Sequence, residues 1–394
     1  MMKTLQGIDL KDKRVLVRVD YNLPMDENQN ILDDNRIAAT IPMINYIVEK
    51  GGKIILISHM GRPKGKKVLS LSLAPAGKRL SLLLGRPVDF ADDCIGPGVN
   101  DRVKGLRSGD ILLLENLRFY SEETSNDKGF AGKLASLCDV FVNDAFSVSH
   151  REQASVVAIT EFAPQSCAGF LLEKEVKCFH DSIENPVRPL VAIVGGAKVS
   201  SKLGALKNML NHIDKLIIGG AMANTFLKGQ GIDVGASMIE EDLVATSAEI
   251  VQEAGERGIA LFLPVDLIVA DRFDANADIL SVNVADIPKN WMGLDIGPET
   301  GVLFAKAMED AGTIVWNGPM GVFEMEKFCG GTKAVAHAVA GSKAFSLVGG
   351  GDTGLAVKVC KVADKISYIS TGGGAFLHLM EGRELPGVTA LMGR

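Results

Sequence analysis

The sequence predicts an α/β protein of two doubly wound, Rossmann-like domains, each with a parallel sheet, joined by a helical hinge. First, apolar strand-like runs alternate with helical patterns along the chain, and strands apolar on both faces are typical of a parallel sheet covered by helices. Second, 394 residues are too many for one ordinary core, so two domains are expected. Third, a helical pattern at 170–177 and a polar, proline-rich segment at 181–189 lie near the middle, where they would connect the domains.

The first half of the chain contains the strands of one expected sheet. These strands are 14–19, 53–58, 111–114 and 140–142. Between the first two strands, Ile37, Ile41, Ile44 and Ile47 recur at the spacing of one helix face. The resulting β–α–β order predicts parallel strands whose carboxyl ends share one edge of the sheet.

In the second half, four apolar runs lead directly into paired glycines. The runs are 191–194 before Gly195-Gly196, 216–218 before Gly219-Gly220, 345–348 before Gly349-Gly350, and 368–371 before Gly372-Gly373. Each predicts a buried strand that ends in a turn opening a helix. Glycine lets a ligand approach the backbone and leaves N–H groups free at a helix start, where anions bind. Four such turns at one edge predict a crevice for phosphates, and hence for a nucleotide.

The composition argues against several classes of protein. A net charge of −6 disfavours a general nucleic-acid binder. No apolar run approaches the ~20 residues of a membrane helix, and the first residues lack the apolar core of a secretory signal, so we expect a cytoplasmic protein with no membrane or nucleic-acid partner. The six cysteines are scattered without a C-x-x-C pair, which indicates reduced thiols rather than disulfides or a zinc site.

Polar residues follow the first two strands of the first half. Asp20 and Asn22 come directly after the first strand, where α/β proteins bind ligands, although a simple turn is the more common role of such residues. His59 and Arg62 follow the second strand and could both point at an anion. A solvated basic loop with a structural histidine explains the second pair equally well.

Three arginines favour the anion hypothesis. Arg36 lies at an expected helix start, and Arg118 and Arg151 lie just past strand ends. A single arginine is usually a surface charge. Three of them beside the His59 loop indicate a shared site for a compact, multiply charged anion, because guanidinium groups pair with carboxylates and phosphates.

The glycine run at 349–354 formally matches the dinucleotide motif G-x-G-x-x-G. Asp352 lies within the run, where its carboxylate would repel phosphates unless a cation intervened. Magnesium is bound in proteins by one or two carboxylates together with phosphates. The loop therefore fits a magnesium nucleotide better than NAD.

Two lysines and one glutamate accompany the glycine turns. Lys198 and Lys202 flank the expected start of the helix after Gly195-Gly196, and a lysine there could reach a phosphate. A cation at a helix start opposes the helix dipole, which favours a function over a merely solvated lysine. Glu324, in the segment 316–324 after another strand, could bind ribose hydroxyls or lie in a turn, and its residues alone leave both interpretations open.

Taken together, these segments resemble the phosphoglycerate kinase family along nearly the whole chain. The matching segments, in the order of the family, are Arg18–Asn22, Ser58–Pro63, Glu115–Phe119, Gly195–Val199, Trp291–Pro298, Trp316–Pro319 and Gly349–Thr353. Single motifs among them are unspecific, but their joint occurrence is highly specific. The chain departs from the usual family pattern at Ser147, Gln153, Phe376 and His378. The first two departures affect the shape of a loop and the last two affect packing between domains, so none removes an assigned residue.

The resemblance implies an enzyme, a phosphotransferase with a carboxyl group as acceptor. It would transfer a phosphoryl group reversibly between Mg-ATP and 3-phosphoglycerate, giving 1,3-bisphosphoglycerate and ADP, a step of glycolysis and gluconeogenesis. The implied domains are a triose-phosphate domain, 1–172, on which the C-terminal segment 378–394 packs back, and a linker helix with a nucleotide domain, 173–377. We expect a monomer that bends at its hinge.

The resemblance also implies roles for single residues. The triose-phosphate site would comprise Asp20, Asn22, Arg36, His59, Arg62, Arg118 and Arg151. The nucleotide site would comprise Lys198, Lys202, Gly293, Asn317, Glu324, Gly350, Gly351, Asp352 and Thr353. Among these, Arg36 and Lys198 would be catalytic, with Lys198 contacting the phosphoryl group in transfer, and Asp352 would bind Mg²⁺.

Two other functions fit parts of the pattern. An NAD-dependent dehydrogenase would use the glycine run at 349–354 as its fingerprint, but Asp352 and the late position of the run disfavour it. A two-lobed binding protein without catalysis would explain a hinge and an anion site, but it does not need four glycine turns. Binding of NADH and turnover of ATP with 3-phosphoglycerate would separate the three functions.

Overall fold

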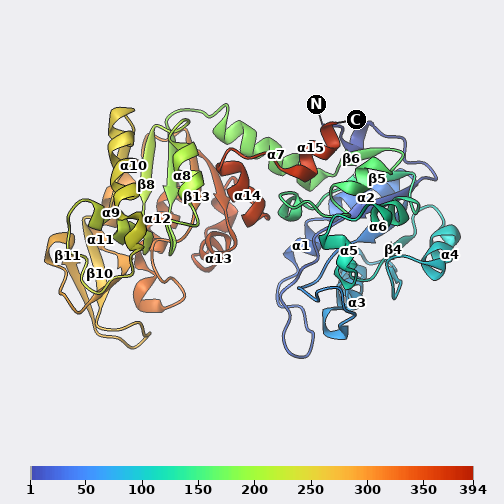
Figure 1. Ribbon diagram of the computed structural model, residues 1–394, viewed down its shortest axis with the longest axis horizontal. Helices are drawn as coiled ribbons and strands as arrows, with labels where there is room; N and C mark the ends of the chain where they lie inside the picture. The colour runs from blue at the N-terminus through green and yellow to red at the C-terminus, as the bar shows by residue number, and fades with distance from the viewer. Residues whose placement is uncertain (1, 394) are drawn as a thin grey trace. The chain divides into compact units, whose positions relative to one another are not determined.

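The computed structural model describes residues 2–393 and divides the chain into two compact units. Among the described residues, unit 1 consists of residues 2–176 and 384–393, and unit 2 consists of Lys177–Arg383. Figure 1 labels their helices and strands. The boundaries expected from the sequence, after residue 172 and before residue 378, fall inside two continuous helices, α7 (Phe170–Ile183) and α14 (Gly373–Met380). The compact units divide at Val176/Lys177, which also lies within α7, and at Arg383/Glu384.

Unit 1 is built on a six-stranded parallel sheet with the order β3-β4-β2-β1-β5-β6. Its strands are β1 (Arg14–Arg18), β2 (Lys53–Ile57), β3 (Asp89–Phe90), β4 (Ile111–Leu113), β5 (Val140–Asn143) and β6 (Ser166–Ala168). The strand order reverses at the neighbours β1 and β5, which pair Val17 with Val142. In a doubly wound sheet, ligands bind at the carboxyl ends of the strands at such a reversal.

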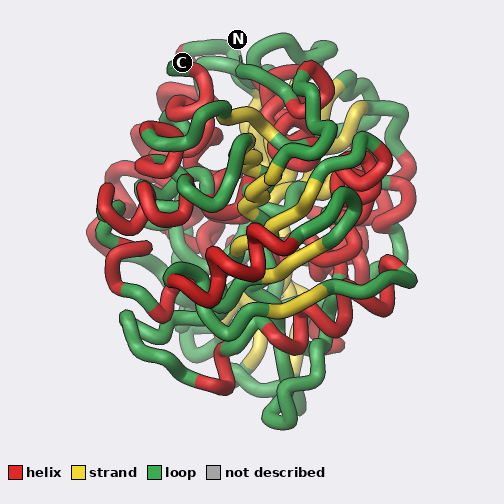
Figure 2. Tube along the Cα trace, turned by 90° about the vertical axis from the view of Figure 1, so that its right-hand side faces the viewer, coloured by secondary structure: helices red, strands yellow, loops and turns green. Residues whose placement is uncertain are grey.

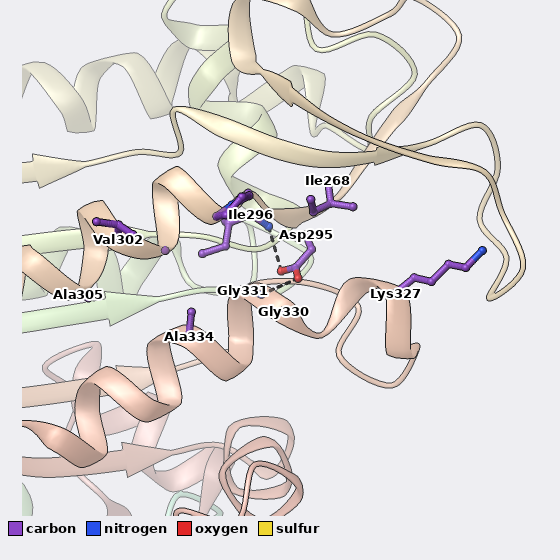
Figure 3. A pocket seen from close by; sticks show the side chains of 12 residues that line it. Ile268, Asp295, Ile296, Val302, Ala305, Lys327, Gly330, Gly331 and Ala334 are labelled. Atoms are coloured by element: carbon purple, nitrogen blue, oxygen red, sulfur yellow. Dashed lines mark hydrogen bonds between the residues drawn. The ribbon is translucent and has the colours of Figure 1, made fainter.

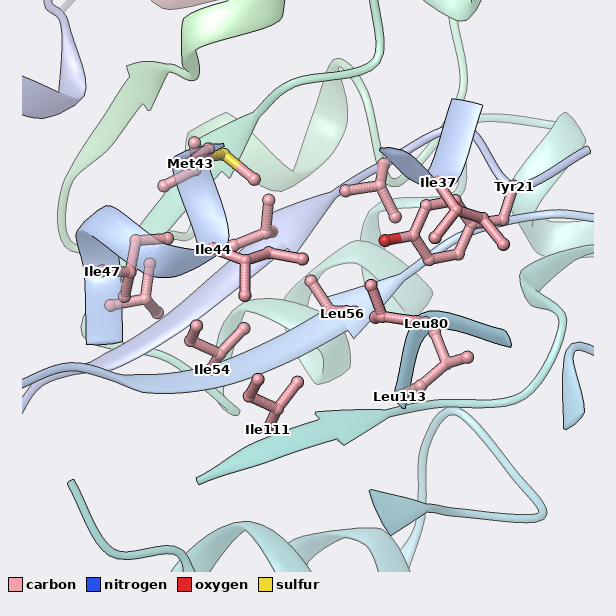
Figure 4. Packing of buried hydrophobic residues seen from close by; sticks show 14 of the residues in the cluster. Tyr21, Ile37, Met43, Ile44, Ile47, Ile54, Leu56, Leu80, Ile111 and Leu113 are labelled. Carbon is pink, nitrogen blue, oxygen red and sulfur yellow. The ribbon is translucent and has the colours of Figure 1, made fainter. Parts of the chain in front are cut away.

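Helices cover both faces of the unit 1 sheet. They are α1 (Asn35–Ala38), α2 (Ile41–Glu49), α3 (Ala74–Leu84), α4 (Pro97–Gly105), α5 (Ser121–Thr124), α6 (Lys128–Ala135), the start of α7, and α15 (Pro386–Met392). In Figure 4, Ile44 and Ile47 of α2 lie against Ile54 of β2 in a fully apolar core. The C-terminal helix α15 lies beside β6, and Gly387 N–H donates to the Ser149 carbonyl at 2.8 Å. This bond ties the end of the chain to unit 1.

Unit 2 contains a second six-stranded parallel sheet with the order β15-β14-β13-β7-β8-β9. Its strands are β7 (Leu190–Val194), β8 (Lys215–Ile218), β9 (Ala260–Phe262), β13 (Thr313–Asn317), β14 (Phe345–Gly349) and β15 (Tyr368–Ile369). The order reverses at β7 and β13, which pair directly. The glycine turns after both strands therefore lie at the reversal point of this sheet.

A small antiparallel sheet, which the sequence analysis did not anticipate, belongs to unit 2. Its strands β10 (Asp266–Ala270), β11 (Ile279–Asn283) and β12 (Met292–Ile296) have the order β11-β10-β12. The edge strand β11 contains the apolar residues Ile279, Leu280 and Val282, but most of its residues are exposed, so it lacks the burial on both faces that is typical of the strands in the parallel sheets.

The helices of unit 2 surround both of its sheets. They are α8 (Leu203–Met209), α9 (Met222–Gly229), α10 (Val244–Glu256), α11 (Pro298–Ala307), α12 (Gly330–Gly341), α13 (Gly351–Val359), α14 and the end of α7. Figure 2, which is viewed from the side of unit 1, shows the strands of that unit in the interior with helices and loops outside them. Within residues 2–393, none of the helices combines the length and the apolar character required to cross a membrane.

The structure confirms the α/β class and the strands expected from apolar runs, to within two residues at each end. The helix expected through Ile37–Ile47 is instead two helices, α1 and α2, because Pro42 lacks the N–H that a continuous helix would need and suits the first turn of a new one. Residues 181–183, expected in the connection, form the last turn of α7. Three of the four glycine turns open a helix directly, whereas after Gly195-Gly196 the helix begins only at Leu203.

Candidate active site

Asp20 is the centre of a polar cluster in unit 1, just past the carboxyl end of β1. Its Oδ2 accepts hydrogen bonds from Arg36 Nη1 at 2.6 Å and from Ser147 Oγ. Its Oδ1 accepts from Asn22 N–H at 3.0 Å and lies 3.8 Å from His59 Nδ1. Burial alone would raise the pKa of Asp20, but the Arg36 guanidinium and the hydrogen bonds from Ser147 and from Asn22 N–H outweigh it and lower this pKa. Asp20 is therefore an ionised carboxylate that orients its neighbours.

The cluster extends from Asp20 to the loop after β2. Asn22 Oδ1 accepts a hydrogen bond from Gly61 N–H at 2.9 Å, and Arg36 Nη1 donates to the Asn22 carbonyl at 3.1 Å. Arg118 Nη1 donates to the Gly61 carbonyl at 2.7 Å from the other side. The structure thus brings together most of the residues expected at the anion site. Arg62 follows Gly61 and is exposed, and within residues 2–393 no hydrogen bond or ion pair ties its side chain to the cluster.

Positive charge dominates the remainder of the unit 1 site. Burial, together with the charges of Arg151 and Arg18, lowers the pKa of Arg118 to about 10. Burial and the same arginines also lower the pKa of His59 well below its ordinary value, although Asp20 opposes them. A bound anion would relieve the repulsion among these cations, so the geometry favours a multiply charged ligand here.

Sequence analysis did not identify three buried residues that support the site. Arg18 ends β1 and contacts His59, and Glu123 and Ser155 contact each other beside it. All three are fully buried. The available signal was an arginine inside the apolar run 14–19, because a buried strand tolerates a charge only when a partner balances it. The partner could not be identified, since Glu123 and Ser155 lie far away in the sequence.

In unit 2, Lys202 and Asn317 join the loops after β7 and β13. Lys202 Nζ donates to the Asn317 carbonyl at 2.9 Å and also to Asn317 Oδ1. Asn317 Nδ2 in turn donates to the Gly349 carbonyl at 2.9 Å, which connects these loops to the end of β14. Burial lowers the pKa of Lys202 to about 8, although the charge of Asp352 opposes this shift. The lysine is therefore a half-buried cation beside the glycine turns.

The turn from β14 into α13 holds four of the expected nucleotide residues, Gly350, Gly351, Asp352 and Thr353. Gly350 precedes the first turn of α13 with a φ of +98°, which a residue with a side chain rarely adopts. Thr353 Oγ1 accepts a hydrogen bond from Gly318 N–H at 2.7 Å, so the turn is fixed to the loop after β13. A Cβ added at Gly351 would meet no other atom within 4 Å. A ligand can therefore approach the backbone at the start of this helix.

Lys198 is not at a helix start, which corrects the argument from the helix dipole. It is exposed in the loop after β7, and α8 begins only at Leu203 with Lys202 before it. The added residues of this loop explain the difference, because they separate the glycines from the helix. Any functional role of Lys198 therefore rests on its exposure and its charge, and not on the helix dipole.

Gly293 and Glu324 differ in exposure, since the first is buried and the second is exposed. Gly293 is buried in β12, where an added Cβ would lie 2.9 Å from Leu267 Cδ1, so packing alone accounts for the glycine. Its N–H donates to Ser237 Oγ at 2.9 Å. Glu324 is exposed in the turn after Val322, whose N–H donates to the Leu294 carbonyl at 2.9 Å. This bond places the turn with Glu324 beside β12.

Asp352 suits a metal ion whose other ligands are mostly waters and the phosphate oxygens of a bound substrate. It lies in the first turn of α13, exposed, directly after the open backbone of Gly351. Residues 2–393 contain no cluster of three or more metal-binding side chains. One carboxylate beside a phosphate site agrees with the chemistry of Mg²⁺, which keeps several waters and takes the rest of its ligands from phosphates.

A separate cavity of about 560 Å³ lies between α11 and the start of α12 (Figure 3). Asp295 points from β12 to the start of α12, where its Oδ2 accepts from Gly331 N–H at 2.7 Å. Burial raises the pKa of Asp295 to about 7. An added Cβ at Gly321 would lie 2.1 Å from this carboxylate, so Asp295 supports the loop after β13 from beneath. None of the expected nucleotide residues lines the cavity, which is therefore a different feature from the glycine turns.

The two polar sites can bind anions in different ways. Unit 1 offers guanidinium groups oriented by an ionised Asp20, which suits a small ligand with several negative charges. Unit 2 offers exposed backbone and lysines at the reversal point of its sheet, which suits the phosphates of a nucleotide.

Comparisons with known proteins identify the family. A family model described as phosphoglycerate kinase matches residues 5–383. The chain is 72% identical over 390 residues to phosphoglycerate kinase of Desulforapulum autotrophicum, covering 99% of this chain and 100% of the relative, and 59% identical over 390 residues to that of Desulfotalea psychrophila, with the same coverage. Its structure is similar to phosphoglycerate kinase from Coxiella burnetii, with a TM-score of 0.91 and 42% identity over 100% of this chain and 99% of that one. It is also similar to the enzyme from Pyrococcus horikoshii OT3, with a TM-score of 0.86 and 33% identity over 99% and 98% of the two chains.

The matches extend over the segments that form both polar sites, from Asp20 to Thr353. Relatives and solved structures agree over nearly the full length of the chain. The chain therefore belongs to the phosphoglycerate kinase family, and it is a kinase of glycolysis.

Proposed function

We propose that this chain transfers a phosphoryl group reversibly between ATP and the carboxylate of 3-phosphoglycerate, in a Mg²⁺-dependent reaction that gives 1,3-bisphosphoglycerate and ADP. The observation that carries the proposal is the presence of two anion sites of different chemistry, one in each unit. Asp20 and Arg36 centre the first, and Lys202 and the glycine turns form the second. A kinase with two anionic substrates needs one site for each.

The triose phosphate would bind to the cluster around Asp20 in unit 1. Arg118 and Arg151 repel each other, so a doubly charged phosphate near them would be stabilised by both. Arg36 is held by Asp20 at 2.6 Å and is directed toward the same site, so it can neutralise charge on the acceptor carboxylate during transfer. Asn22, His59 and Arg62 would complete the binding site.

The nucleotide would bind to the glycine turns of unit 2. The phosphates would be held by Lys202, Asn317, Gly350, Gly351 and Thr353, and the nucleoside would lie near Gly293 and Glu324. Lys198 is an exposed cation on the loop after β7 and can move to the phosphoryl group in transfer. In a site without water, a preorganised cation of this kind stabilises the spread negative charge of the transition state.

Asp352 would hold Mg²⁺ together with the nucleotide phosphates. When bound, the ion would neutralise phosphate charge and orient the phosphates for in-line transfer. The chain itself contributes one carboxylate on the first turn of α13, while Gly351 leaves the backbone open for the phosphates beside it.

The proposed reaction needs no general base, and this agrees with the residues of both sites. The acceptor is a carboxylate, which is already ionised at neutral pH. In unit 1, His59 has a lowered pKa and its Nδ1 lies 3.2 Å from the Arg18 guanidinium. The enzyme would act by positioning the substrates and by neutralising charge.

We further propose that the units close during the reaction. The triose-phosphate residues belong to unit 1 and the nucleotide residues belong to unit 2. Transfer needs the reacting atoms ~3–3.5 Å apart. Closure would also exclude water, which would hydrolyse the acyl phosphate product. Small-angle scattering should show a smaller radius of gyration with both substrates than with either alone, and an unchanged radius would contradict closure.

A coupled assay of ADP formation tests the reaction. We expect ADP release from Mg-ATP only when 3-phosphoglycerate is present, and no change in nicotinamide fluorescence when NADH is mixed with the protein. ATP turnover that does not depend on 3-phosphoglycerate would contradict the proposal, whereas NADH binding would favour a dehydrogenase. The monomeric state and the cytoplasmic location stay predictions, which gel filtration and cell fractionation would test.

A further inference from the structure

Arg18 is a charged residue at the end of a buried, apolar strand. Its side chain is fully buried, and its guanidinium makes three hydrogen bonds. Nε donates to Ser155 Oγ at 2.9 Å, Nη1 donates to the Val19 carbonyl, and Nη2 lies 3.2 Å from His59 Nδ1. A guanidinium has donors only, so each of its partners must act as an acceptor. Arg18 therefore fixes the positions of hydrogen atoms on the groups around it.

The first branch of this network runs from Arg18 to Glu123. Ser155 Oγ accepts from Arg18, so its own hydrogen is directed to Glu123 Oε1 at 2.7 Å. Ser155 N–H donates to Glu123 Oε2 at 3.0 Å. Ser155 and Glu123 are both fully buried. The Glu123 carboxylate thus balances the charge of Arg18 and, through Ser155, holds the guanidinium in one orientation.

The second branch runs from Arg18 to His59. Because Nδ1 must accept from Nη2, a neutral His59 carries its hydrogen on Nε2. Asp20 Oδ1 lies 3.8 Å from Nδ1, which is beyond hydrogen-bond distance, so Asp20 does not hold a hydrogen on Nδ1. The second ring nitrogen is left for a ligand, since among residues 2–393 the structure gives it no hydrogen-bond partner.

The charged groups around His59 favour the same protonation state. Arg18 on β1, Arg118 after β4 and Arg151 after β5 disfavour an imidazolium, and Asp20 after β1 is the one group that favours it. Burial is the largest contribution, and the balance lowers the pKa of His59 well below its ordinary value. The ring therefore stays neutral at pH 7.

We propose that Arg18 is a positioning residue that holds His59 as the neutral Nε2–H tautomer, so that His59 offers a hydrogen-bond donor to the triose phosphate. This inference rests on the proposed function of the unit 1 site. In this form His59 neither removes a proton from the substrate nor adds a charge that changes with pH. Its contribution is one oriented N–H beside the arginines, available at every pH at which the substrate is fully ionised.

Nuclear magnetic resonance of the full-length protein with ¹⁵N-labelled histidine tests the tautomer without any substrate. The chain has six histidines, and the His59 signals can be assigned from their loss in His59→Gln. We expect an unprotonated Nδ1 and a protonated Nε2 that do not change between about pH 6 and 8. A proton on Nδ1, or an imidazolium at pH 7, would overturn the proposal.

Substitution of Arg18 tests the cause. Arg18→Lys keeps the charge, but one ammonium group cannot reproduce the fork that reaches both Ser155 and His59. We expect the His59 ring in this variant to show a mixture of tautomers, or to titrate at a higher pH than in the wild type. An unchanged ring in a folded Arg18→Lys protein would show that Arg18 does not determine the tautomer. If this variant does not fold, the wild-type spectrum still decides whether the tautomer is correct.

Two variants of His59 test the use of the donor. The amide N–H of glutamine can take the place of Nε2–H, whereas asparagine reaches only to the place of Nδ1. We expect the KM for 3-phosphoglycerate to be about 10-fold or more higher in His59→Asn than in His59→Gln, because a hydrogen bond to a charged group is lost. The affinity for ADP should be equal in both, and equal KM values would contradict the donor role. If the wild type shows no turnover that depends on 3-phosphoglycerate, the proposed function fails while the tautomer measured without substrate still stands.

Discussion

Asp144 should make unit 1 less stable as the pH rises, and Asp144→Asn should remove this effect. The residue follows β5 and is almost completely buried. Its Oδ1 accepts hydrogen bonds from Leu171 N–H at 2.7 Å and Leu172 N–H at 3.3 Å, at the start of α7. Its Oδ2 is buried with no hydrogen-bond partner among residues 2–393. Burial outweighs the two bonds and raises the pKa of Asp144 from 3.8 to about 7.

The sign and size of the effect follow from this shift. A carboxyl whose pKa is raised in the folded state binds its proton more tightly there than in the unfolded chain, so stability falls as the pH rises from 3.8 toward 7. The rise of this pKa from 3.8 to about 7 means that the free energy of unfolding falls by about 4 kcal/mol in total when the pH is raised through this range. About a third of this decrease has already occurred at pH 5. The free energy of unfolding of the wild type should therefore fall by about 2 to 3 kcal/mol between pH 5 and 8 through this group. Asparagine does not titrate, so the difference between variant and wild type should grow by this amount.

Urea unfolding at several pH values measures the difference. Both tryptophans, Trp291 and Trp316, belong to unit 2, so their fluorescence reports on the unfolding of unit 2. Circular dichroism detects the unfolding of both units, so a transition seen by circular dichroism but not by tryptophan fluorescence is the unfolding of unit 1. Asp139→Asn is the matched control in unit 1. The hydrogen bond with Arg14 lowers the pKa of Asp139, so its stabilising effect is lost only in more acidic solution and the control should be flat between pH 5 and 8. A difference between Asp144→Asn and wild type that does not change with pH would refute the argument.

Three further outcomes are expected from the two sites. Lys198→Ala should lower kcat by about 10²–10³-fold with little change in ADP affinity. As a control, Lys207→Ala on the exposed face of α8 should leave kcat unchanged. Near-normal turnover of Lys198→Ala would exclude a role of Lys198 in phosphoryl transfer. Asp352→Ala should weaken ADP binding in the presence of Mg²⁺ but not in its absence, and calorimetry that finds no Mg²⁺ dependence in the wild type would contradict the metal role. Ser147→Ala removes a hydrogen bond that favours ionised Asp20, so the pKa of Asp20 should rise and the acidic limb of kcat/KM for 3-phosphoglycerate should move to higher pH; a limb that stays in place would show that Ser147 does not tune Asp20.

Sequence reasoning placed the strand ends well because burial on both faces leaves a strong local signal. The apolar run 191–194 became β7, and the glycines after it lie at the reversal point of the sheet. Asp20, which follows β1, was placed near the strand ends for the same reason, whereas the role of Asn317 at the end of β13 is implied by the family resemblance and stays a prediction. Parallel strands place their carboxyl ends at one edge, so their order along the chain is enough to gather these residues.

Other features depend on contacts that sequence order does not encode. Lys198 was expected at a helix start, but the loop after Gly196 continues to Lys202 before α8 begins. The edge strand β11 is mostly exposed and is held by pairing with β10, so an expectation based on strands buried on both faces did not include it. Arg18 is the last residue of an apolar strand, but its balancing charge on Glu123 comes from another part of unit 1.

Each unit places a buried carboxyl with a pKa near 7 at the start of a helix beside its ligand loop. Asp144 binds N–H groups at the start of α7 and lies three residues before Ser147, which donates to Asp20. Asp295 binds the start of α12 and lies against Gly321 in the loop after β13. Ionisation would strengthen these hydrogen bonds to the helix start while it raises the cost of burial. Because the acceptor of the proposed reaction is already a carboxylate, neither group is needed to move a proton, and their titration should act on loop order and stability rather than on the transfer step itself.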